Sequence, residues 1–209
     1  MKFYDMALAP SPRRVRMFIA EKGIEIETVQ VDLGGGEQLE PAFAKLNPWC
    51  TVPVLELDDG TCISEAIACC RYLEAAYPEP PLMGVTPAEQ GVIAMWEHRV
   101  EWDGFIAGAE ILRNSAKRLR GRALTGATSF DQIPELAERG KKRIAALLEM
   151  LDTRFGESEY LAGDAFTVAD ITALIAIDFV RRQKLEIPAD RPHVKRWHDL
   201  VSARPSASA

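Results

Sequence analysis

The chain has 209 residues, of which 47% are hydrophobic and 27% are charged, a composition typical of a globular protein with one or two domains. Its formal net charge of -6 argues against nucleic acid as the main partner, because phosphate binding requires a basic face. No apolar run approaches the roughly 20 residues that a membrane span needs, and the first residues show no apolar export signal. We therefore expect a cytoplasmic protein that binds neither nucleic acid nor membrane.

The cysteines indicate the same compartment. Cys50, Cys62, Cys69 and Cys70 form no CxxC pair and have no zinc-ligand spacing. A reducing cytoplasm is the simplest setting for such thiols, and we predict no metal site. Cys69 and Cys70 fall inside an expected helix, where we expect them to be inert. Cys50 is interpreted either as a buried small side chain or as a thiol that forms a mixed disulfide.

The first third of the chain reads as strand, helix and strand. Residues 2–4 are a short strand candidate. Ser11 and Pro12 then start a helix, because serine is a favoured N-cap and proline is favoured at the first helical position. Gly23 ends this helix, and residues 24–33 follow as a strand. Such a unit normally forms a parallel strand pair with a right-handed crossover.

The next segment completes a small α/β unit. Residues 34–36, all glycine, are expected to form a flexible loop, and residues 41–46 at most a short helix. Residues 54–57 and 61–63 read as a hairpin, and residues 64–76 as a helix with one apolar face. This order predicts a four-stranded mixed sheet with helices packed against it.

Prolines then mark a linker, and the remainder of the chain is almost wholly helical. The proline-dense segment contains Pro78, Pro80, Pro81 and Pro87. Beyond it, a long helix carries a second apolar side, which indicates burial or an interface. This side consists of Val92, Met95, Trp102 and Ile106. We predict an α/β domain at residues 1–80, a linker at 81–87 and an all-α domain at 88–209.

The step from Val52 to Pro53 is the most informative local feature. Proline within an apolar run cannot donate to a central ladder, so it belongs at the start of a strand or at a sheet edge. If the Val52–Pro53 bond is cis, the N–H and C=O groups of Val52 face a ligand instead of a neighbouring strand. This arrangement suits a small peptide-like molecule.

Five motifs in chain order resemble those of the glutathione transferase family. They are the helix at residues 12–24, Asn47-Pro48 through Val52-Pro53, Ser64-Glu65 with Arg71 to Glu74, Thr167 to Ile171, and Trp197 with Arg204-Pro205-Ser206. The resemblance covers nearly the whole chain. It implies an α/β thioredoxin-like N-terminal domain plus an all-α C-terminal domain, commonly paired as a homodimer. It further implies glutathione as co-substrate, no metal, and a small hydrophobic or anionic electrophile as second substrate.

The resemblance also assigns the glutathione-binding residues. Val52 and Pro53 correspond to the backbone partner of the cysteinyl part, and Gln38 to a contact with the glycyl end. Glu65 and Ala66 begin a helix, whose free N–H groups bind the γ-glutamyl carboxylate while Glu65 accepts from the ammonium group. Each assignment has a structural alternative. Val52 and Pro53 could form an ordinary strand start, and Gln38 could be a solvated loop residue. Glu65 could be an acid in the first turn that favours the helix dipole.

Two departures from the family pattern concern the chemistry. Ala66 stands where the family usually has serine, and losing one hydrogen bond to a charged group weakens binding roughly 10- to 150-fold. Ala9 stands where the family supplies a hydroxyl or thiol to the glutathione sulfur. Ser11 is then the candidate catalytic residue, and its alternative role is that of helix cap. Tyr4 is one residue out of step with the tyrosine-type classes, and we interpret it as strand packing.

We predict a glutathione transferase that activates the thiol for attack on an electrophilic, peroxide or disulfide substrate. The alternatives are a non-catalytic glutathione-binding or interaction protein on the same fold, suggested by Ala9 and Ala66, and an ether-cleaving or dehalogenating transferase. The basic segment 113–122 is either a solvated helix end or the border of a second-substrate pocket that favours anionic electrophiles. Thr167 and Asp170 are predicted to form a capping box that serves the fold.

Overall fold

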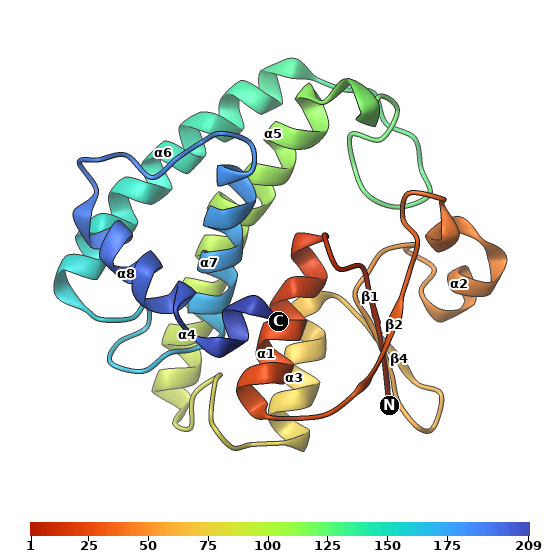
Figure 1. The fold of residues 1–209 in the computed structure, drawn as a ribbon, viewed down its shortest axis with the longest axis horizontal. Helices are drawn as coiled ribbons and strands as arrows, with labels where there is room; N and C mark the ends of the chain where they lie inside the picture. Colours follow the sequence, from red (N-terminus) through yellow and green to blue (C-terminus); the bar gives the residue numbers. More distant parts are fainter. The chain divides into compact units, whose positions relative to one another are not determined.

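The computed structural model describes residues 1–209, which divide into two compact units. The first contains residues 1–80, 124–129 and 209, and the second contains residues 81–123 and 130–208. Figure 1 shows the elements of both units, coloured along the chain. Segment 124–129 belongs with the first unit, where a Cβ at Gly126 would lie only 3.2 Å from the carbonyl oxygen of Trp49.

The first unit is built on the mixed four-stranded sheet that the sequence predicts. In chain order its elements are β1 (Lys2–Asp5), α1 (Pro10–Lys22), β2 (Glu27–Gln30), η1 (Glu37–Leu39), α2 (Pro41–Leu46), β3 (Val54–Glu56), β4 (Cys62–Ser64) and α3 (Ala66–Ala76). The strand order is β2-β1-β3-β4, with β1 and β2 parallel and the other two pairs antiparallel. The prediction of a four-stranded mixed sheet is therefore confirmed.

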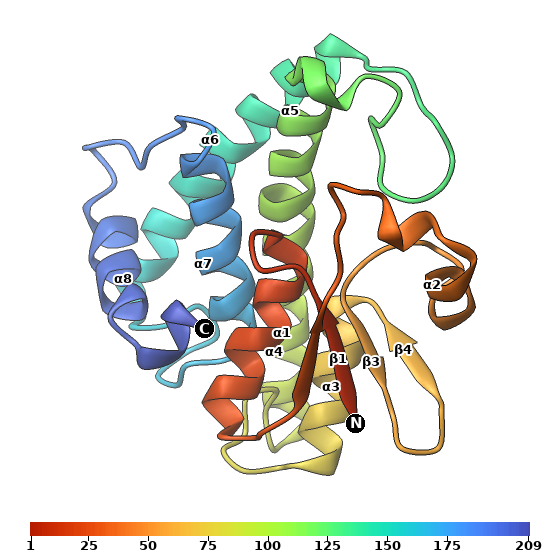
Figure 2. The same ribbon diagram turned by 45° about the vertical axis from the view of Figure 1, so that its right-hand side comes forward.

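Helices cover this sheet because its strands alternate apolar side chains between their two faces. Helices α1 and α3 pack side by side against the strands (Figure 2), with Phe18 of α1 and Leu73 of α3 fully buried. A separate apolar cluster joins Val31, Phe43 of α2 and Val54 of β3. Burial of apolar side chains between the sheet and helices α1, α2 and α3 thus stabilises the first unit.

Two boundaries differ from the predicted ones, since β2 covers only Glu27–Gln30 of the predicted strand 24–33 and α1 starts earlier than expected. Helix α1 begins at Pro10 with Ala9 as its N-cap, so the expected start at Ser11 and Pro12 is wrong. Both Pro10 and Pro12 fit the first helical turn, where a missing N–H costs nothing, and the structure uses both. Gly23 ends α1 in the left-handed conformation, with φ of 63°, as expected.

The second unit consists of helices joined by short turns. Its elements are α4 (Pro87–Val100), the π-helical turn η2 (Glu101–Ile106), α5 (Ala107–Ser115), η3 (Lys117–Leu119), α6 (Pro134–Glu157), α7 (Val168–Arg181), α8 (Pro192–Ser202) and η4 (Pro205–Ser208). Figure 2 shows that α4, η2 and α5 form one continuous run. Helix α7 is buried on nearly every side and packs against α4, η2, α5 and α8, which makes it the centre of this unit's core.

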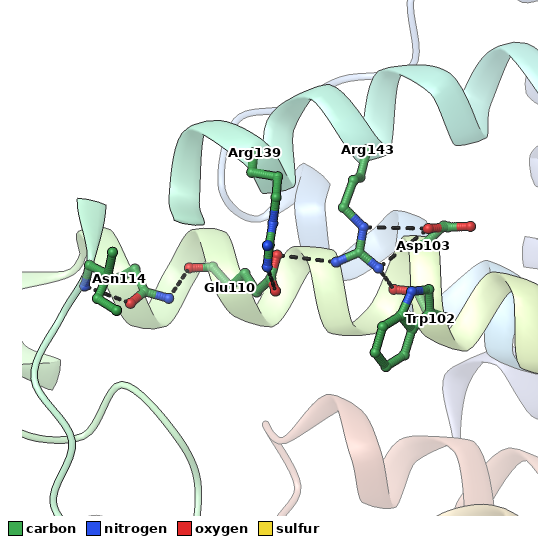
Figure 3. A network of polar contacts seen from close by, with 7 residues as sticks. Trp102, Asp103, Glu110, Asn114, Arg139 and Arg143 are labelled. Atoms are coloured by element: carbon green, nitrogen blue, oxygen red, sulfur yellow. Dashed lines mark hydrogen bonds and ion pairs between the residues drawn. The ribbon is translucent and has the colours of Figure 1, made fainter. Parts of the chain in front are cut away.

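A polar network fastens α6 to the run formed by η2 and α5 (Figure 3). The guanidinium of Arg143 on α6 bonds Asp103 at 3.3 Å and Glu110 at 3.1 Å, and it also donates to the carbonyl oxygen of Trp102. Arg139, one turn earlier, bonds Glu110 at 2.6 Å. Arg143 therefore donates to a carbonyl of the π-helical turn. The sequence pattern predicted a regular helix there.

The predicted capping box at the start of α7 is confirmed. The carboxylate of Asp170 accepts from the backbone N–H and the hydroxyl of Thr167, at 3.1 and 3.2 Å. It also accepts from the N–H of Leu161 and from Nε1 of Trp197, both at 2.9 Å. Because Trp197 lies on α8 and stacks on Phe155 of α6, with ring centroids 4.6 Å apart, one carboxylate connects three helices.

Replacing Asp170 should remove a pH-dependent contribution to the free energy of unfolding. Burial raises the pKa of Asp170 to about 6, against the opposing hydrogen bonds, whereas an unfolded chain releases this proton near pH 4. The folded protein therefore binds more protons between these values, and its stability falls as the pH rises from about 4 to about 6. The change attributable to Asp170 is about 3 kcal/mol.

Urea unfolding of the wild type and of Asp170→Asn across this pH range measures the effect. The variant should be less stable throughout, because its amide leaves buried donors without an acceptor. The stability difference between wild type and variant should shrink as the pH rises. A difference that grows with pH would contradict the prediction.

Candidate functional site

The register of the sheet brings several loops to one end of the first unit. Tyr4 of β1 pairs with Val54 at the start of β3, and Val54 pairs with Ser64 at the end of β4. On the other edge of β1, Asp5 pairs with Gln30 at the end of β2. The loops that follow β1, β2 and β4 therefore leave the sheet at the end where the chain enters β3.

All predicted site residues belong to these loops or to the elements next to them. Ser11 follows β1 in the first turn of α1, and Gln38 follows β2 in η1. Val52 and Pro53 precede β3, while Glu65 and Ala66 follow β4 at the start of α3. The topology thus gathers residues from four separate parts of the sequence at one end of the sheet.

The Val52–Pro53 peptide bond is cis, which is the condition set by the sequence analysis. The ladder of β3 begins at Val54, so the N–H and C=O groups of Val52 lie outside the strand pairing. The preceding loop is held by Asn47, a buried residue whose side-chain amide donates to the carbonyl and the hydroxyl of Thr51 at 2.8 and 3.0 Å. This supporting role of Asn47 was missed by the sequence analysis, although asparagine beside proline is a common turn signal.

Glu65 has an unusual backbone. It is the N-cap of α3, with φ of 70°, a region that non-glycine residues rarely adopt and that costs about 1–3 kcal/mol. Its side chain is exposed and makes no capping bond. Glu65 precedes the first turn, so its expected place within that turn is wrong, but its carboxylate still belongs to the N-terminal end of α3 and the alternative that it favours the helix dipole stays open.

Ala66 is the first residue of α3 and is buried, so only its backbone can serve a ligand. Helix geometry leaves the N–H groups of the first turn without intrahelical partners, which makes this helix start a site for an anion. The free N–H groups and the exposed carboxylate of Glu65 offer complementary charges side by side.

Gln38 lies in η1, beside a turn that is more ordered than the expected glycine loop. Asp32 accepts from the N–H of Gly35 at 2.9 Å, and its own N–H donates to Glu37 at 2.6 Å. The side chain of Gln38 is half-buried, and its amide oxygen is buried without a hydrogen-bond partner. This enclosed oxygen does not fit a fully solvated loop residue, and the contact of Gln38 with the glycyl end stays a prediction.

Ser11 is the second residue of α1 and does not cap it, because Ala9 occupies the N-cap without a side-chain bond. The cap interpretation of Ser11 is therefore wrong. Its half-buried hydroxyl accepts a hydrogen bond of 3.2 Å from Nη2 of Arg14. Since the cap role does not apply, the hydroxyl remains available for a ligand at the start of the helix.

Asp5 holds the loop between β1 and α1 in place, a role that the sequence did not reveal. Its buried carboxylate accepts from Nη1 of Arg16 at 2.5 Å and from the amide of Gln30 at 2.7 Å. Both partners also bond Ala7, Arg16 through the carbonyl at 2.9 Å and Gln30 through the N–H at 2.9 Å. The backbone before Ser11 is consequently fixed by β2 and α1 together.

Tyr4 serves strand packing, as expected. Its hydroxyl donates to Glu56 at 2.7 Å, and its ring meets Phe43 edge-on with centroids 6.1 Å apart. Burial and the neighbouring Glu56 carboxylate raise the pKa of Tyr4 to about 12. A phenol with this pKa stays protonated and engaged with Glu56 at neutral pH.

None of the four cysteines forms a disulfide. Cys50 is buried with φ of 54°, and its thiol lies 3.7 Å from the carbonyl oxygen of Pro48. Burial raises the pKa of the Cys69 thiol to about 12, in keeping with an inert residue. The structure contains no group of three or more histidine, cysteine, aspartate and glutamate side chains arranged to hold a metal ion.

The basic segment 113–122 follows the end of α5. Arg113 donates to the carbonyl of Arg122 at 2.9 Å, and burial lowers its pKa. Arg118 and Arg120 are exposed. Cations at the C-terminal end of a helix are stabilised by the helix dipole, which fits the interpretation of a solvated helix end. In the whole structure, no helix combines the length and the apolarity that crossing a membrane requires.

Comparison with known proteins places both units in one family. Residues 9–76 match the family model described as glutathione S-transferase, N-terminal domain, and residues 116–205 match glutathione S-transferase, C-terminal domain. Two curated relatives extend over nearly the whole chain. Glutathione S-transferase 2 of Saccharomyces cerevisiae is 34% identical over 99% of this chain and 87% of its own length. Glutathione S-transferase 3 of Zea mays is 32% identical over 99% of this chain and 90% of its own length.

A solved structure also matches this chain over nearly its whole length. The crystal structure of a glutathione S-transferase domain-containing protein from Marinobacter aquaeolei is 38% identical and superimposes with a TM-score of 0.92, covering 99% of each chain. The two-part fold expected from the sequence, a thioredoxin-like α/β domain followed by a helical domain, is thereby confirmed.

Proposed function

Because the chain belongs to the glutathione S-transferase family, we propose that it binds glutathione at the end of the sheet where the four loops meet and activates its thiol. The observation that carries the proposal is the convergence of Ser11, Gln38, Val52 and the start of α3 at that end. The activated sulfur then attacks a small hydrophobic or anionic electrophile, a peroxide or a disulfide.

Each part of glutathione has a chemically matched group. The unpaired backbone groups of Val52 suit the extended cysteinyl unit, as an added strand would. The N–H groups at the start of α3 suit the γ-glutamyl carboxylate, and the carboxylate of Glu65 suits the neighbouring ammonium. The side-chain amide of Gln38 suits the glycyl carboxylate, because its NH2 group can donate a hydrogen bond to it.

The chemistry requires a thiolate, because the thiolate and not the thiol is the nucleophile. In our proposal the Ser11 hydroxyl donates to the glutathione sulfur, and the thiol proton passes to solvent. A free thiol has a pKa near 8.5, and each unit by which the site lowers it corresponds to about 1.36 kcal/mol. The N-terminal end of α1 assists, since its first turn contains no acid.

The alternative is a glutathione-binding protein without catalysis on the same fold. Two observations favour it: Ala9, at the position of the family's usual hydroxyl, is the N-cap of α1, and Ala66 has no polar side chain. Neither residue can donate to sulfur or carboxylate from its side chain. The protonation state of the bound glutathione sulfur distinguishes the two functions, because only the enzyme needs a thiolate.

We also propose that the protein acts as a homodimer in the cytoplasm. The support is a row of exposed apolar side chains on one helical run, at Val92, Met95 and Trp102, which are 40%, 57% and 56% exposed. Exposed large apolar side chains that recur along one helical run are compatible with a protein–protein interface.

Removing the carboxylate of Glu65 should weaken glutathione binding without unfolding the protein. Glu65→Gln keeps the size and the backbone but loses a charge-assisted bond to the ammonium group, worth about 1.5–3 kcal/mol. Calorimetric titration with glutathione should show affinity reduced roughly 10- to 150-fold. The thermal midpoint should stay within about 2 °C, since the side chain is exposed.

Glu25→Gln is the matched control, because Glu25 is also exposed but precedes β2, at the opposite end of the sheet. It should bind glutathione like the wild type. Equal affinity of Glu65→Gln and Glu25→Gln would remove Glu65 from the site.

Removing the hydroxyl of Ser11 should raise the pKa of the bound thiol. The ultraviolet thiolate band of the glutathione complex, followed against pH, reports this pKa directly. The wild type should show the band at neutral pH, and Ser11→Ala should shift its midpoint upward by about 1–2 units, with turnover at neutral pH falling about 10- to 100-fold.

The wild-type complex also decides between the two functions. Binding without a thiolate band would support the binding protein, and absence of binding at millimolar glutathione would reject both. Unchanged turnover and an unchanged band in Ser11→Ala would exclude Ser11 as the activating group.

We further propose that the basic segment 113–122 favours anionic second substrates. Reversing two exposed charges, in Arg118→Glu with Arg120→Glu, should raise the KM for an anionic electrophile about fivefold at low salt. The effect should shrink as salt screens the charges. An equal change in KM for a neutral electrophile would overturn this specificity.

A further inference from the structure

The loop at residues 121–130, between α5 and α6 in Figure 1, is closed at its base and exposed along its length. Its two ends meet, because the N–H of Phe130 donates to the carbonyl of Gly121 at 3.1 Å and the N–H of Ala123 donates to the carbonyl of Phe130 at 3.2 Å. Leu124 and Phe130 are 58% and 44% exposed, so burial of these side chains does not account for the conformation of the loop. Compact loops whose ends are close together are frequently functional.

Hydrogen bonds also hold the chain on both sides of this base. Arg113 donates to the carbonyl of Arg122 at 2.9 Å, at the start of the loop. After the loop, the side-chain amide of Gln132 donates to the carbonyls of Arg113 and Ala116 at 2.7 and 2.9 Å. Both ends of the loop 121–130 are therefore anchored to the end of α5 and the turn that follows it.

The tip of the loop, residues 124–129, belongs to the first unit. At Gly126 in this tip, an added Cβ would lie 3.2 Å from the carbonyl oxygen of Trp49. Gly126 also has φ of 101°, a conformation that residues with a side chain rarely adopt. The backbone conformation and the available space therefore each require glycine at this point.

Trp49 lies in the loop that presents Val52, and one side chain ties the parts of this loop together. Oδ1 of Asn47 accepts from the N–H of Trp49 at 3.1 Å, and Nδ2 of Asn47 donates to the carbonyl of Thr51 at 2.8 Å. The N–H of Cys50 donates to the carbonyl of Asn47 at 2.9 Å. A displacement of Trp49 is therefore passed to Thr51 and to the peptide group of Val52 that follows it.

We propose that the loop 121–130 is a brace for the glutathione site and that Gly126 is a positioning residue within it. Contact of the tip with the carbonyl of Trp49 keeps Val52 where its backbone pairs with the cysteinyl unit. The inference rests on the proposed binding of glutathione at Val52. In this scheme Gly126 acts through Trp49 and does not contact glutathione, whereas thiol activation depends on Ser11.

Gly126→Ala tests the brace, because the added methyl group must displace either the tip or Trp49. Calorimetric titration should show glutathione affinity reduced about 3- to 10-fold, the size expected when one or two backbone hydrogen bonds are weakened. The KM for glutathione should rise by the same factor, while kcat at saturating glutathione and the pKa of the bound thiol keep their wild-type values. Unchanged affinity, or a fall in kcat with an unchanged KM, would overturn the proposal.

Gly60→Ala is the matched control. Gly60 also has a positive φ, of 85°, but it lies in the turn between β3 and β4, at the end of the sheet away from the site. An added Cβ at Gly60 would meet nothing within 4 Å apart from its chain neighbours. Both variants should lower the thermal midpoint, because alanine disfavours positive φ. Only Gly126→Ala should weaken glutathione binding, and an equal loss of affinity in Gly60→Ala would reduce the effect to general destabilisation.

Hydrogen exchange, followed by mass spectrometry, tests the brace through the mobility of the backbone. Without glutathione, exchange in residues 47–53 should be faster in Gly126→Ala than in the wild type or Gly60→Ala. In the wild type, glutathione should slow exchange in residues 124–129 as well as in 47–53. Protection confined to 47–53 would contradict the brace, and this measurement decides the outcome even if Gly126→Ala fails to fold.

Failure of the proposed function looks different from failure of this inference. If the wild type does not bind glutathione, the proposed function itself falls. If the wild type binds glutathione and Glu65→Gln binds it more weakly, unchanged affinity and unchanged exchange in Gly126→Ala would overturn the brace alone.

Discussion

The double pairing of the short strand β1 positions everything at the candidate site. Its parallel partner β2 and its antiparallel partner β3 fix which loops share an end of the sheet, and β4 follows from β3. A shift of one residue in this register would turn every side chain of the strand to the other face. The buried carboxylate of Asp5 secures the register where it matters, since it bonds α1 and β2 at the same point.

Much of this fold depends on local sequence preferences and could therefore be predicted from the sequence. Proline at Pro53, the hairpin turn and the capping box at Asp170 each act through a conformational preference of a few residues. The start of α1 could not be resolved, because Pro10 and Pro12 satisfy the same preference two residues apart. The left-handed backbone of Glu65 had no sequence signal, since glycine or asparagine is the usual residue there.

The supporting groups were harder to foresee than the residues that face a ligand. Asp5 acts through partners that are distant in sequence, Arg16 and Gln30, and Asn47 acts through Thr51 in the same loop, where only the adjacent proline gives a turn signal. A shared fold accommodates different chemistry, and the resemblance places Ala9 and Ala66 at positions where the family usually has polar side chains.

Glu65 places thermodynamic stability and ligand recognition in competition at a single position. Glycine there would relieve the left-handed backbone, and the chain would gain about 1 kcal/mol. The same replacement would delete the only side chain at the head of α3 that carries a charge. A laboratory selection for heat resistance alone would therefore favour glycine at position 65, and the selected proteins would fold well and lack this carboxylate.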